Sequence, residues 1–143
     1  MSIKLLFYII IACILSSIEN ASTIILPTIP NIQYIGRLHH SNLQSPKFNW
    51  VGTKIISNFE GNSLKLLLKC SARTHFNVSI DDSTSVLIAL NTKDTYQLCS
   101  GLKNGKHSLL IFRSDSPGLT ATLNGFIIDD GKKLLPPSTR SNR

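Results

Sequence analysis

The chain has 143 residues, with 15 lysines and arginines against 8 aspartates and glutamates, which gives a formal net charge of +7. The basic residues are scattered and form neither a block nor a helical stripe, so the charge argues against nucleic-acid binding. The length is sufficient for one domain with a single hydrophobic core.

The first 21 residues have the pattern of a secretory signal. Lys4 supplies a positive charge and precedes an apolar run over residues 5–15. This run is shorter than the roughly 20 apolar residues that a membrane-spanning helix needs. We therefore expect residues 1–21 to be removed, and the remaining chain to be secreted, extracellular and without membrane contact. Residues 22–33, which contain two prolines, are expected to form an extended lead-in.

A hairpin pattern lies between residues 53 and 69, on both sides of a turn at Glu60-Gly61-Asn62. Before the turn, alternation places Ile55 and Phe59 on one face, and after it three alternate leucines share one face. Alternation of period two around a glycine-containing turn predicts a β-hairpin. A hairpin cannot bury its apolar face alone, so this one predicts a packed sandwich or barrel.

Further short alternating segments follow at regular spacing and are separated by turn-rich clusters. No segment has a sustained helical period, so we predict an all-β sandwich over residues 34–135. Residues 136–143 are rich in proline and polar residues, which is typical of a linker or tail. The predicted strands are residues 34–39, 48–51, 54–59, 63–69, 76–81, 85–90, 96–98, 107–113 and 121–129.

Two features predict covalent modification. Cys70 and Cys99 are the cysteines that remain after signal removal, and an even pair in a secreted domain favours a disulfide. The alternative is two separate thiols, because the sequence does not set their distance. Asn77-Val78-Ser79 is an N-glycosylation sequon, and strand alternation turns Asn77 outward while Val78 faces the core.

Short motifs in a common order extend over nearly all of the remaining chain, from residue 34 to residue 137. They include Tyr34-Ile35-Gly36-Arg37, Trp50-Val51-Gly52-Thr53, Asn58-Phe59-Glu60-Gly61, Asn77-Val78-Ser79-Ile80-Asp81, Gly105-Lys106-His107, Leu123-Asn124-Gly125-Phe126 and Asp130-Gly131-Lys132-Lys133-Leu134-Leu135-Pro136-Pro137. Together they resemble the N-terminal domain of the family 2 carbohydrate esterases. The resemblance implies a jelly-roll sandwich of two antiparallel sheets, similar to galactose-binding domains.

In that family the jelly roll precedes an SGNH-type hydrolase domain that removes acetyl groups from xylan and related plant polysaccharides. Its nucleophile lies in a Gly-Asp-Ser motif, and neither this motif nor Gly-x-Ser-x-Gly occurs in the sequence. Serine acyl transfer needs a nucleophile, a base and oxyanion donors. The resemblance therefore implies a non-catalytic accessory domain without a cofactor. Its partners would be plant cell-wall polysaccharide of the xylan type or an SGNH hydrolase domain.

Four residues are candidates for sugar contact: Trp50, Tyr96, Arg37 and Arg113. Aromatic rings stack on apolar sugar faces, and arginine forks hold hydroxyls or carboxylates. The favoured alternative for Trp50 is a cap on the core, since tryptophan is usually mostly buried. For Arg113 it is local pairing with Asp115. A working sugar site would make the chain a stand-alone lectin-like module, and a third hypothesis is a structural domain that contacts only protein.

One departure from the family pattern lies at Phe112-Arg113-Ser114-Asp115, where the family commonly has Lys-Arg-Thr-Glu. A contact made by that lysine has no counterpart here. The histidines lack suitably spaced acidic or cysteine neighbours, so no metal site is expected. His107 is expected to satisfy backbone groups beside the Gly105 turn, and Asp81-Asp82 to form a turn.

Overall fold

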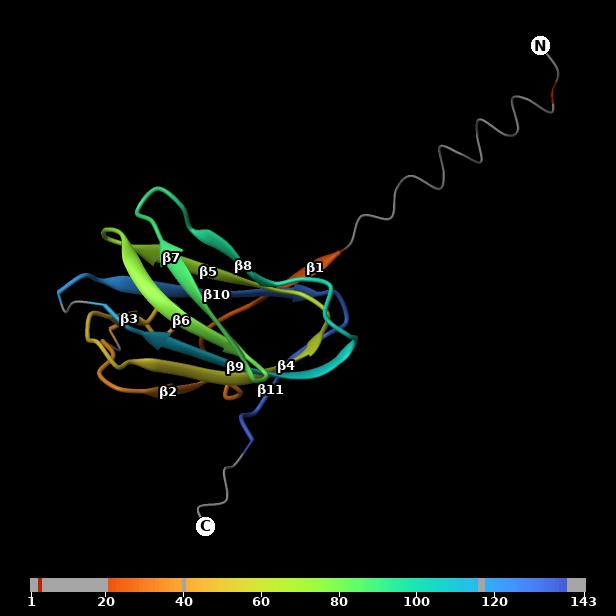
Figure 1. Ribbon diagram of the computed structural model, residues 1–143, viewed down its shortest axis with the longest axis horizontal. Helices are drawn as coiled ribbons and strands as arrows, with labels where there is room; N and C mark the ends of the chain where they lie inside the picture. Colours follow the sequence, from red (N-terminus) through yellow and green to blue (C-terminus); the bar gives the residue numbers. More distant parts are fainter. Residues whose placement is uncertain (1–2, 4–20, 40, 116–117, 139–143) are drawn as a thin grey trace.

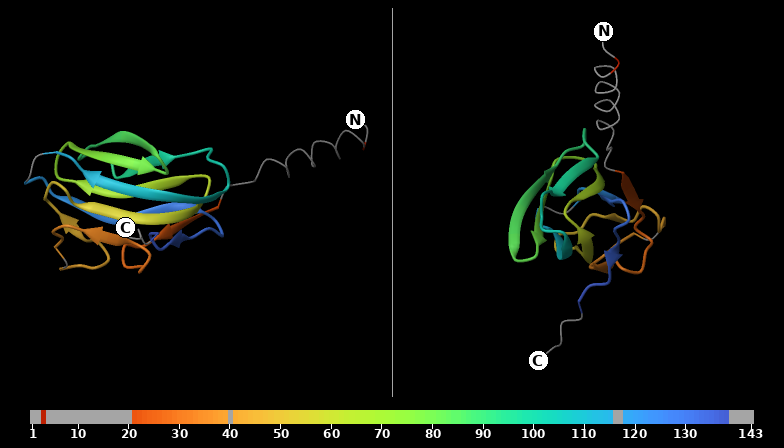
Figure 2. Two further views of the ribbon diagram at one scale, coloured as in Figure 1. Left: turned by 60° about the horizontal axis from the view of Figure 1, so that its bottom comes forward. Right: turned by 90° about the vertical axis from the view of Figure 1, so that its right-hand side faces the viewer.

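The computed structural model describes residue 3 and residues 21–39, 41–115 and 118–138. The predicted signal, apart from residues 3 and 21, lies outside the described residues, and so do residues 139–143 of the predicted tail. Within the described ranges, the strands form two antiparallel sheets that face each other as two layers (Figures 1 and 2). The all-β jelly-roll sandwich predicted from the sequence is confirmed.

Each sheet combines strands that are distant in the sequence. The first sheet has the order β1 (Ser22–Ile25), β10 (Ala121–Asp129), β5 (Leu64–Cys70) and β8 (Thr95–Cys99), with β3 (Lys47–Phe48) also paired to β10. The second sheet has the order β11 (Leu134–Leu135), β4 (Lys54–Gly61), β9 (Gly105–Arg113), β6 (Thr74–Ile80) and β7 (Ser83–Ala89), with β2 (Gln33–Ile35) also paired to β4. The predicted hairpin strands therefore separate, because β4 belongs to the second sheet and β5 to the first (Figure 1).

The core lies between the two sheets and follows the predicted alternation. Ile55 and Phe59 of β4 are buried, as are the three alternate leucines of β5. The rings of Phe48 and Phe76 meet edge to face, with centroids 6.2 Å apart, and so link β3 of one sheet to β6 of the other. The largest fully buried apolar side chains are those of Phe48, Phe59, Phe76, Phe126, Ile55, Leu64, Leu66, Leu68, Leu109, Ile111 and Leu123.

The N-terminal boundary of the sandwich differs from the prediction. Residues 22–25, expected in the lead-in, form β1 and pair with the far end of β10. Gly125 allows β1 to approach β10, because a Cβ at this position would collide with the Ile25 carbonyl oxygen. Gly125 also has a φ of +136° and lies at a register shift between β10 and β5. Strand β1 therefore depends on a glycine a hundred residues away, which a local pattern does not reveal.

The predicted disulfide is wrong, because Cys70 and Cys99 lie at opposite ends of the same pairing. Cys70 is the last residue of β5, whereas Cys99 of β8 is paired with Leu64, the first residue of β5. Six strand steps separate the Cα atoms by roughly 20 Å, whereas a disulfide requires less than about 7 Å. Both residues are free thiols, and burial raises the pKa of Cys99 to about 11.

Candidate functional site

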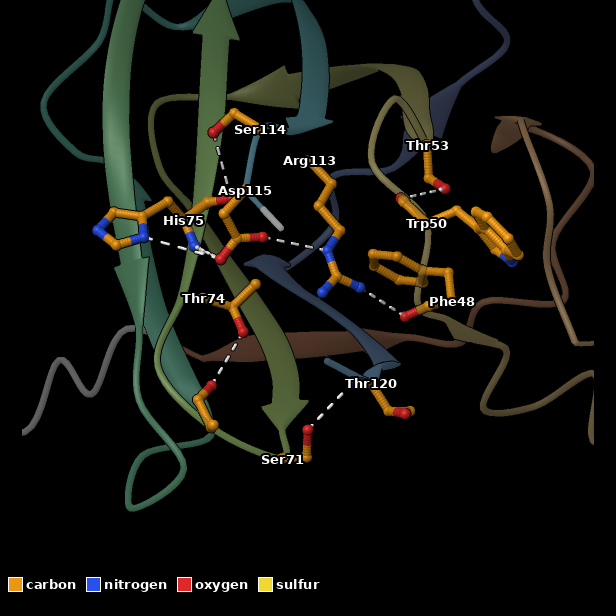
Figure 3. A network of polar contacts seen from close by, with 11 residues as sticks. Phe48, Trp50, Thr53, Ser71, Thr74, His75, Arg113, Ser114, Asp115 and Thr120 are labelled. Carbon is orange, nitrogen blue, oxygen red and sulfur yellow. Dashed lines mark hydrogen bonds and ion pairs between the residues drawn. The ribbon is translucent and has the colours of Figure 1, made fainter. Parts of the chain in front are cut away.

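The side chain of Trp50 lies on the surface, in the loop between β3 and β4. It is 45% exposed, and the neighbouring Val51 is exposed to the same extent. The ring points away from the core network around Arg113 (Figure 3). The expectation that Trp50 caps the core is therefore wrong.

Arg37 covers one face of the Trp50 ring. Its guanidinium carbon lies 4.7 Å from the ring centroid, a cation–π distance. Gly36 makes the approach possible, since its φ of +118° turns the chain after β2 and a Cβ there would lie 3.1 Å from the Thr53 Cα. We call Trp50 and Arg37 together the Trp50–Arg37 platform. It presents an aromatic face beside a planar donor, which suits a sugar ring with its hydroxyls.

Arg113, the last residue of β9, holds the loop that carries Trp50. Its backbone N–H donates to the Thr53 carbonyl and its own carbonyl accepts the Gly52 N–H, each at 3.0 Å. Its Nη1 donates to the Phe48 carbonyl at 2.9 Å. The Thr53 hydroxyl donates to the Trp50 carbonyl at 3.0 Å. Arg113 therefore fixes the loop on both sides of Trp50 (Figure 3).

Arg113 is completely buried, so it is not a sugar contact. Its Nε lies 3.3 Å from Asp115 Oδ1, which confirms the predicted local pairing. Asp115 Oδ2 accepts the backbone N–H of His75 at 2.9 Å. Two buried polar atoms, Arg113 Nη2 and Asn49 Oδ1, have no hydrogen-bond partner among the described residues. The network is a structural anchor rather than an open binding surface.

His107 and Asp81 form a second polar pair, at the opposite end of β9. His107 Nδ1 lies 2.8 Å from Asp81 Oδ2, and Nε2 lies 2.7 Å from the Lys103 carbonyl. The hydrogen bond to Asp81 raises the pKa of His107, and the same bond lowers the pKa of Asp81. Both ring nitrogens face acceptors, which suits the imidazolium. His107 therefore has no free nitrogen to act as a general base.

The two other predicted residues lie away from the platform. Tyr96 is buried, and its hydroxyl contacts the backbone of Leu90 and Lys93 at 2.8–3.1 Å. Burial raises the pKa of the Tyr96 phenol. Its role is to hold the β7–β8 loop, so burial removes it from the candidate sugar contacts. Asn77 lies on the outer face of the second sheet, between Phe112 of β9 and Val86 of β7.

No group of three or more His, Cys, Asp or Glu side chains in the described ranges is arranged to hold a metal ion. Across that same part of the chain, no helix has the length and apolarity to cross a membrane.

The sequence did not reveal the pairing of His107 with Asp81 or the anchoring of the Trp50 loop by Arg113. Both depend on which residues become neighbours across strands. One available signal was the placement of glycines. Gly36 directly precedes Arg37 and Gly52 follows Trp50 by two residues, and both glycines have positive φ, which is typical of turns.

The sequence and the fold were compared with known proteins. Residues 34–137 match the family model described as Carbohydrate esterase 2 N-terminal. The Cellulase/esterase CelE of Acetivibrio thermocellus is 30% identical over 110 residues, which make up 76% of this chain but only 14% of that protein. A family two carbohydrate esterase from Clostridium thermocellum, solved in complex with cellohexaose, is 27% identical with a TM-score of 0.68, over 74% of this chain and 33% of that one. A family 35 carbohydrate binding module from an environmental isolate shares the fold, with 13% identity and a TM-score of 0.59 over 80% of this chain and 98% of that one.

Proposed function

The chain belongs to the carbohydrate esterase 2 N-terminal family, and from this premise we propose that it is a non-catalytic accessory domain of a secreted carbohydrate esterase. Its role is to contact plant cell-wall polysaccharide of the xylan type through the Trp50–Arg37 platform. The observation that carries the proposal is the exposed Trp50 ring with the Arg37 guanidinium 4.7 Å from its centroid. An aromatic ring held open by a buried anchor can bind sugar without a large entropic cost.

The chemistry of the described residues supports a binding role rather than ester cleavage. His107 has both nitrogens engaged, and His75 Nδ1 lies 3.7 Å from Asp115, beyond hydrogen-bond distance. Neither imidazole is hydrogen-bonded to a serine hydroxyl, the arrangement that activates a serine nucleophile. Ester cleavage in relatives of this family would then reside outside this domain, and the platform would serve to hold the chain on its polysaccharide.

Retention of the full chain on insoluble acetylated xylan and cellulose tests the proposal. We expect Trp50→Ala to lower the affinity roughly tenfold, the loss that one aromatic stacking contact gives. Ile24→Ala is the matched control, because Ile24 is another exposed apolar residue but lies on β1 of the first sheet. Titration with xylo- and cello-oligosaccharides can be followed by tryptophan fluorescence, since Trp50 is the single tryptophan.

Two results would contradict the proposal: no retention of the wild-type chain, or equal retention of the wild type and Trp50→Ala. Retention of a separately expressed SGNH hydrolase domain without sugar binding would instead favour a protein-interaction role. Arg37→Ala provides a graded check, because it removes the guanidinium and leaves the ring. We expect it to weaken binding less than the loss of Trp50 does.

A further inference from the structure

Strand β7 is an unusually open edge of the second sheet. It follows β6 at the end of that sheet and has no strand on its other side among the described residues (Figure 1). It is seven residues long, whereas the other terminal or side strands, β1, β2, β3, β8 and β11, have two to five residues each. A long unpaired edge exposes a row of backbone donors and acceptors.

The composition of this edge favours pairing. Residues 83–90 contain no charged residue, no proline and no glycine, although the whole chain carries a charge of +7. Val86 is 65% exposed, and Ile88 and Leu90 are also exposed large apolar residues. Natural sheets protect long edges with lysine, proline or bulges, and residues 83–90 have none of these. The apolar side chains therefore remain available on a regular strand.

A groove runs beside the first half of β7, between the two sheets. It has a volume of about 470 Å³ and is lined by apolar side chains that include Ile80, Leu98 and Leu102. Asp81, Asp82, Ser83 and Ser85 form its polar side at the turn and the β7 edge. Ser83 and Ser85 lie opposite Ile80 and Val78, on the core-facing side of β7, yet both are exposed. Strand β8 of the facing sheet therefore does not cover Ser83 and Ser85.

We propose that β7 pairs with β7 of a second copy of this chain, antiparallel and about a two-fold axis near Val86. The edge is self-complementary in this arrangement, because the same residues face one another in both directions. Antiparallel pairing brings the turn before β7 of each copy, which carries Asp81 and Asp82, toward the loop after β7 of the other, which carries Lys93 beside Asp94. Because that loop has no net charge, the ends add no strong repulsion, and the uncharged edge itself sets the pairing.

The same register places Leu87 of the second copy opposite Ser85, beside the groove. Leu87 packs partly against its own core, so in the dimer its remaining exposed surface would border the groove of the other copy and add some burial to the strand hydrogen bonds. The other end of the second sheet offers only β2 and β11, of three and two residues. Pairing therefore closes as a dimer and does not continue as a fibre. The proposal is independent of the sugar-binding function.

Sedimentation of the full chain at about 100 µM tests the proposal, since a complex of micromolar affinity is mostly formed at that concentration. We expect a dimer for the wild type and a monomer for Val86→Lys, which places a charge on the edge and, in the dimer, next to its own symmetry mate. Ile24→Lys is the matched control, because it changes an exposed apolar residue of β1 in the other sheet. It should remain a dimer.

Circular dichroism checks that each variant is folded, and Ile88→Lys provides a second edge variant with the same expected result. Hydrogen exchange gives an independent readout, with backbone amides of β7 becoming more protected as concentration rises. A wild-type monomer at this concentration would overturn the proposal. So would a dimer that survives both edge variants, or one that Ile24→Lys abolishes equally, because the contact would then lie elsewhere.

Discussion

Strand β9 has an imidazole beside a carboxylate at each of its ends, and the two pairs are built differently. At its start, His107 lies 2.8 Å from Asp81, and the His107 side chain is only 10% exposed. At its other end, His75 lies 3.7 Å from Asp115 and its side chain is 41% exposed. His107 and Asp81 are therefore hydrogen-bonded, whereas the His75 ring and Asp115 are close but too far apart for a hydrogen bond.

The difference follows from which group supplies the positive charge. At the start of β9, the imidazolium itself binds Asp81 and also donates to the Lys103 carbonyl. At the other end, the carboxylate of Asp115 is already occupied by the Arg113 guanidinium and the His75 backbone N–H. Arginine remains charged at any accessible pH, but histidine does not. The two ends of one strand should therefore respond differently to mutation and to pH.

Arg113→Met should have the largest effect. It removes a fully buried cation, leaves Asp115 without its charge partner and frees the Phe48 carbonyl. We expect the free energy of unfolding to fall by about 3 kcal/mol, as is typical when one partner of a buried pair is lost. Urea unfolding at neutral pH measures this. Tryptophan emission should also shift, because the Trp50 loop loses its anchor.

The control for this variant is Arg73→Met, at an exposed arginine in the loop before β6. Its unfolding free energy should stay within about 0.5 kcal/mol of the wild type. Arg113→Lys keeps the charge but loses the planar fork, so it should lie between the two. Equal stability of Arg113→Met and Arg73→Met would show that the anchor contributes nothing.

Asp81→Asn should have a smaller, pH-dependent effect. The folded-state pKa of His107 is raised, so its stabilisation is complete below the unfolded value of about 6.5 and is lost as pH rises through the folded value. The folded-state pKa of Asp81 is lowered, so its contribution is present above about 3.9 and is lost as pH falls through the folded value. The pair therefore stabilises the fold most between about pH 4 and pH 6.5.

Urea unfolding at two pH values checks this expectation. The wild type should exceed Asp81→Asn by about 1 kcal/mol near pH 5.5, and by less near pH 9, a modest value because Asp81 is half exposed. Asp82→Asn is the matched control, as an exposed aspartate in the same turn, and should show no such pH dependence. A difference for Asp81→Asn that grows toward high pH would reverse the assigned sign.

The sequence predicts the properties of single strands but not the contacts between strands. Alternation of period two located most strands and placed Phe59 on the same face as Ile55, and both are buried, because the face of a strand is a local property. Partners across strands are not local. The separation of Cys70 from Cys99 and the pairing of Asp81 with His107 both depend on register, which no window of residues contains.

Trp50 shows the limit of reasoning from residue type. Tryptophan is usually mostly buried, yet this one lies in a loop whose path is set by a positive-φ glycine at Gly52 and by Arg113. The buried aromatic of this segment is instead Phe48, two residues earlier, which is 1% exposed. The sequence placed both aromatics in one strand over residues 48–51, but β3 ends at Phe48.

Of the variants Arg113→Met, Asp81→Asn and His75→Gln, the last should have the smallest effect. Asp115 accepts the backbone N–H of His75, which any residue except proline supplies, and its other oxygen binds Arg113. The imidazole, at 3.7 Å, adds no hydrogen bond, so we expect urea unfolding at pH 7 to change by less than about 0.5 kcal/mol. A loss as large as that of Asp81→Asn near pH 5.5 would mean that the imidazole, and not the backbone, holds Asp115. The contrast between the two ends of β9 would then disappear.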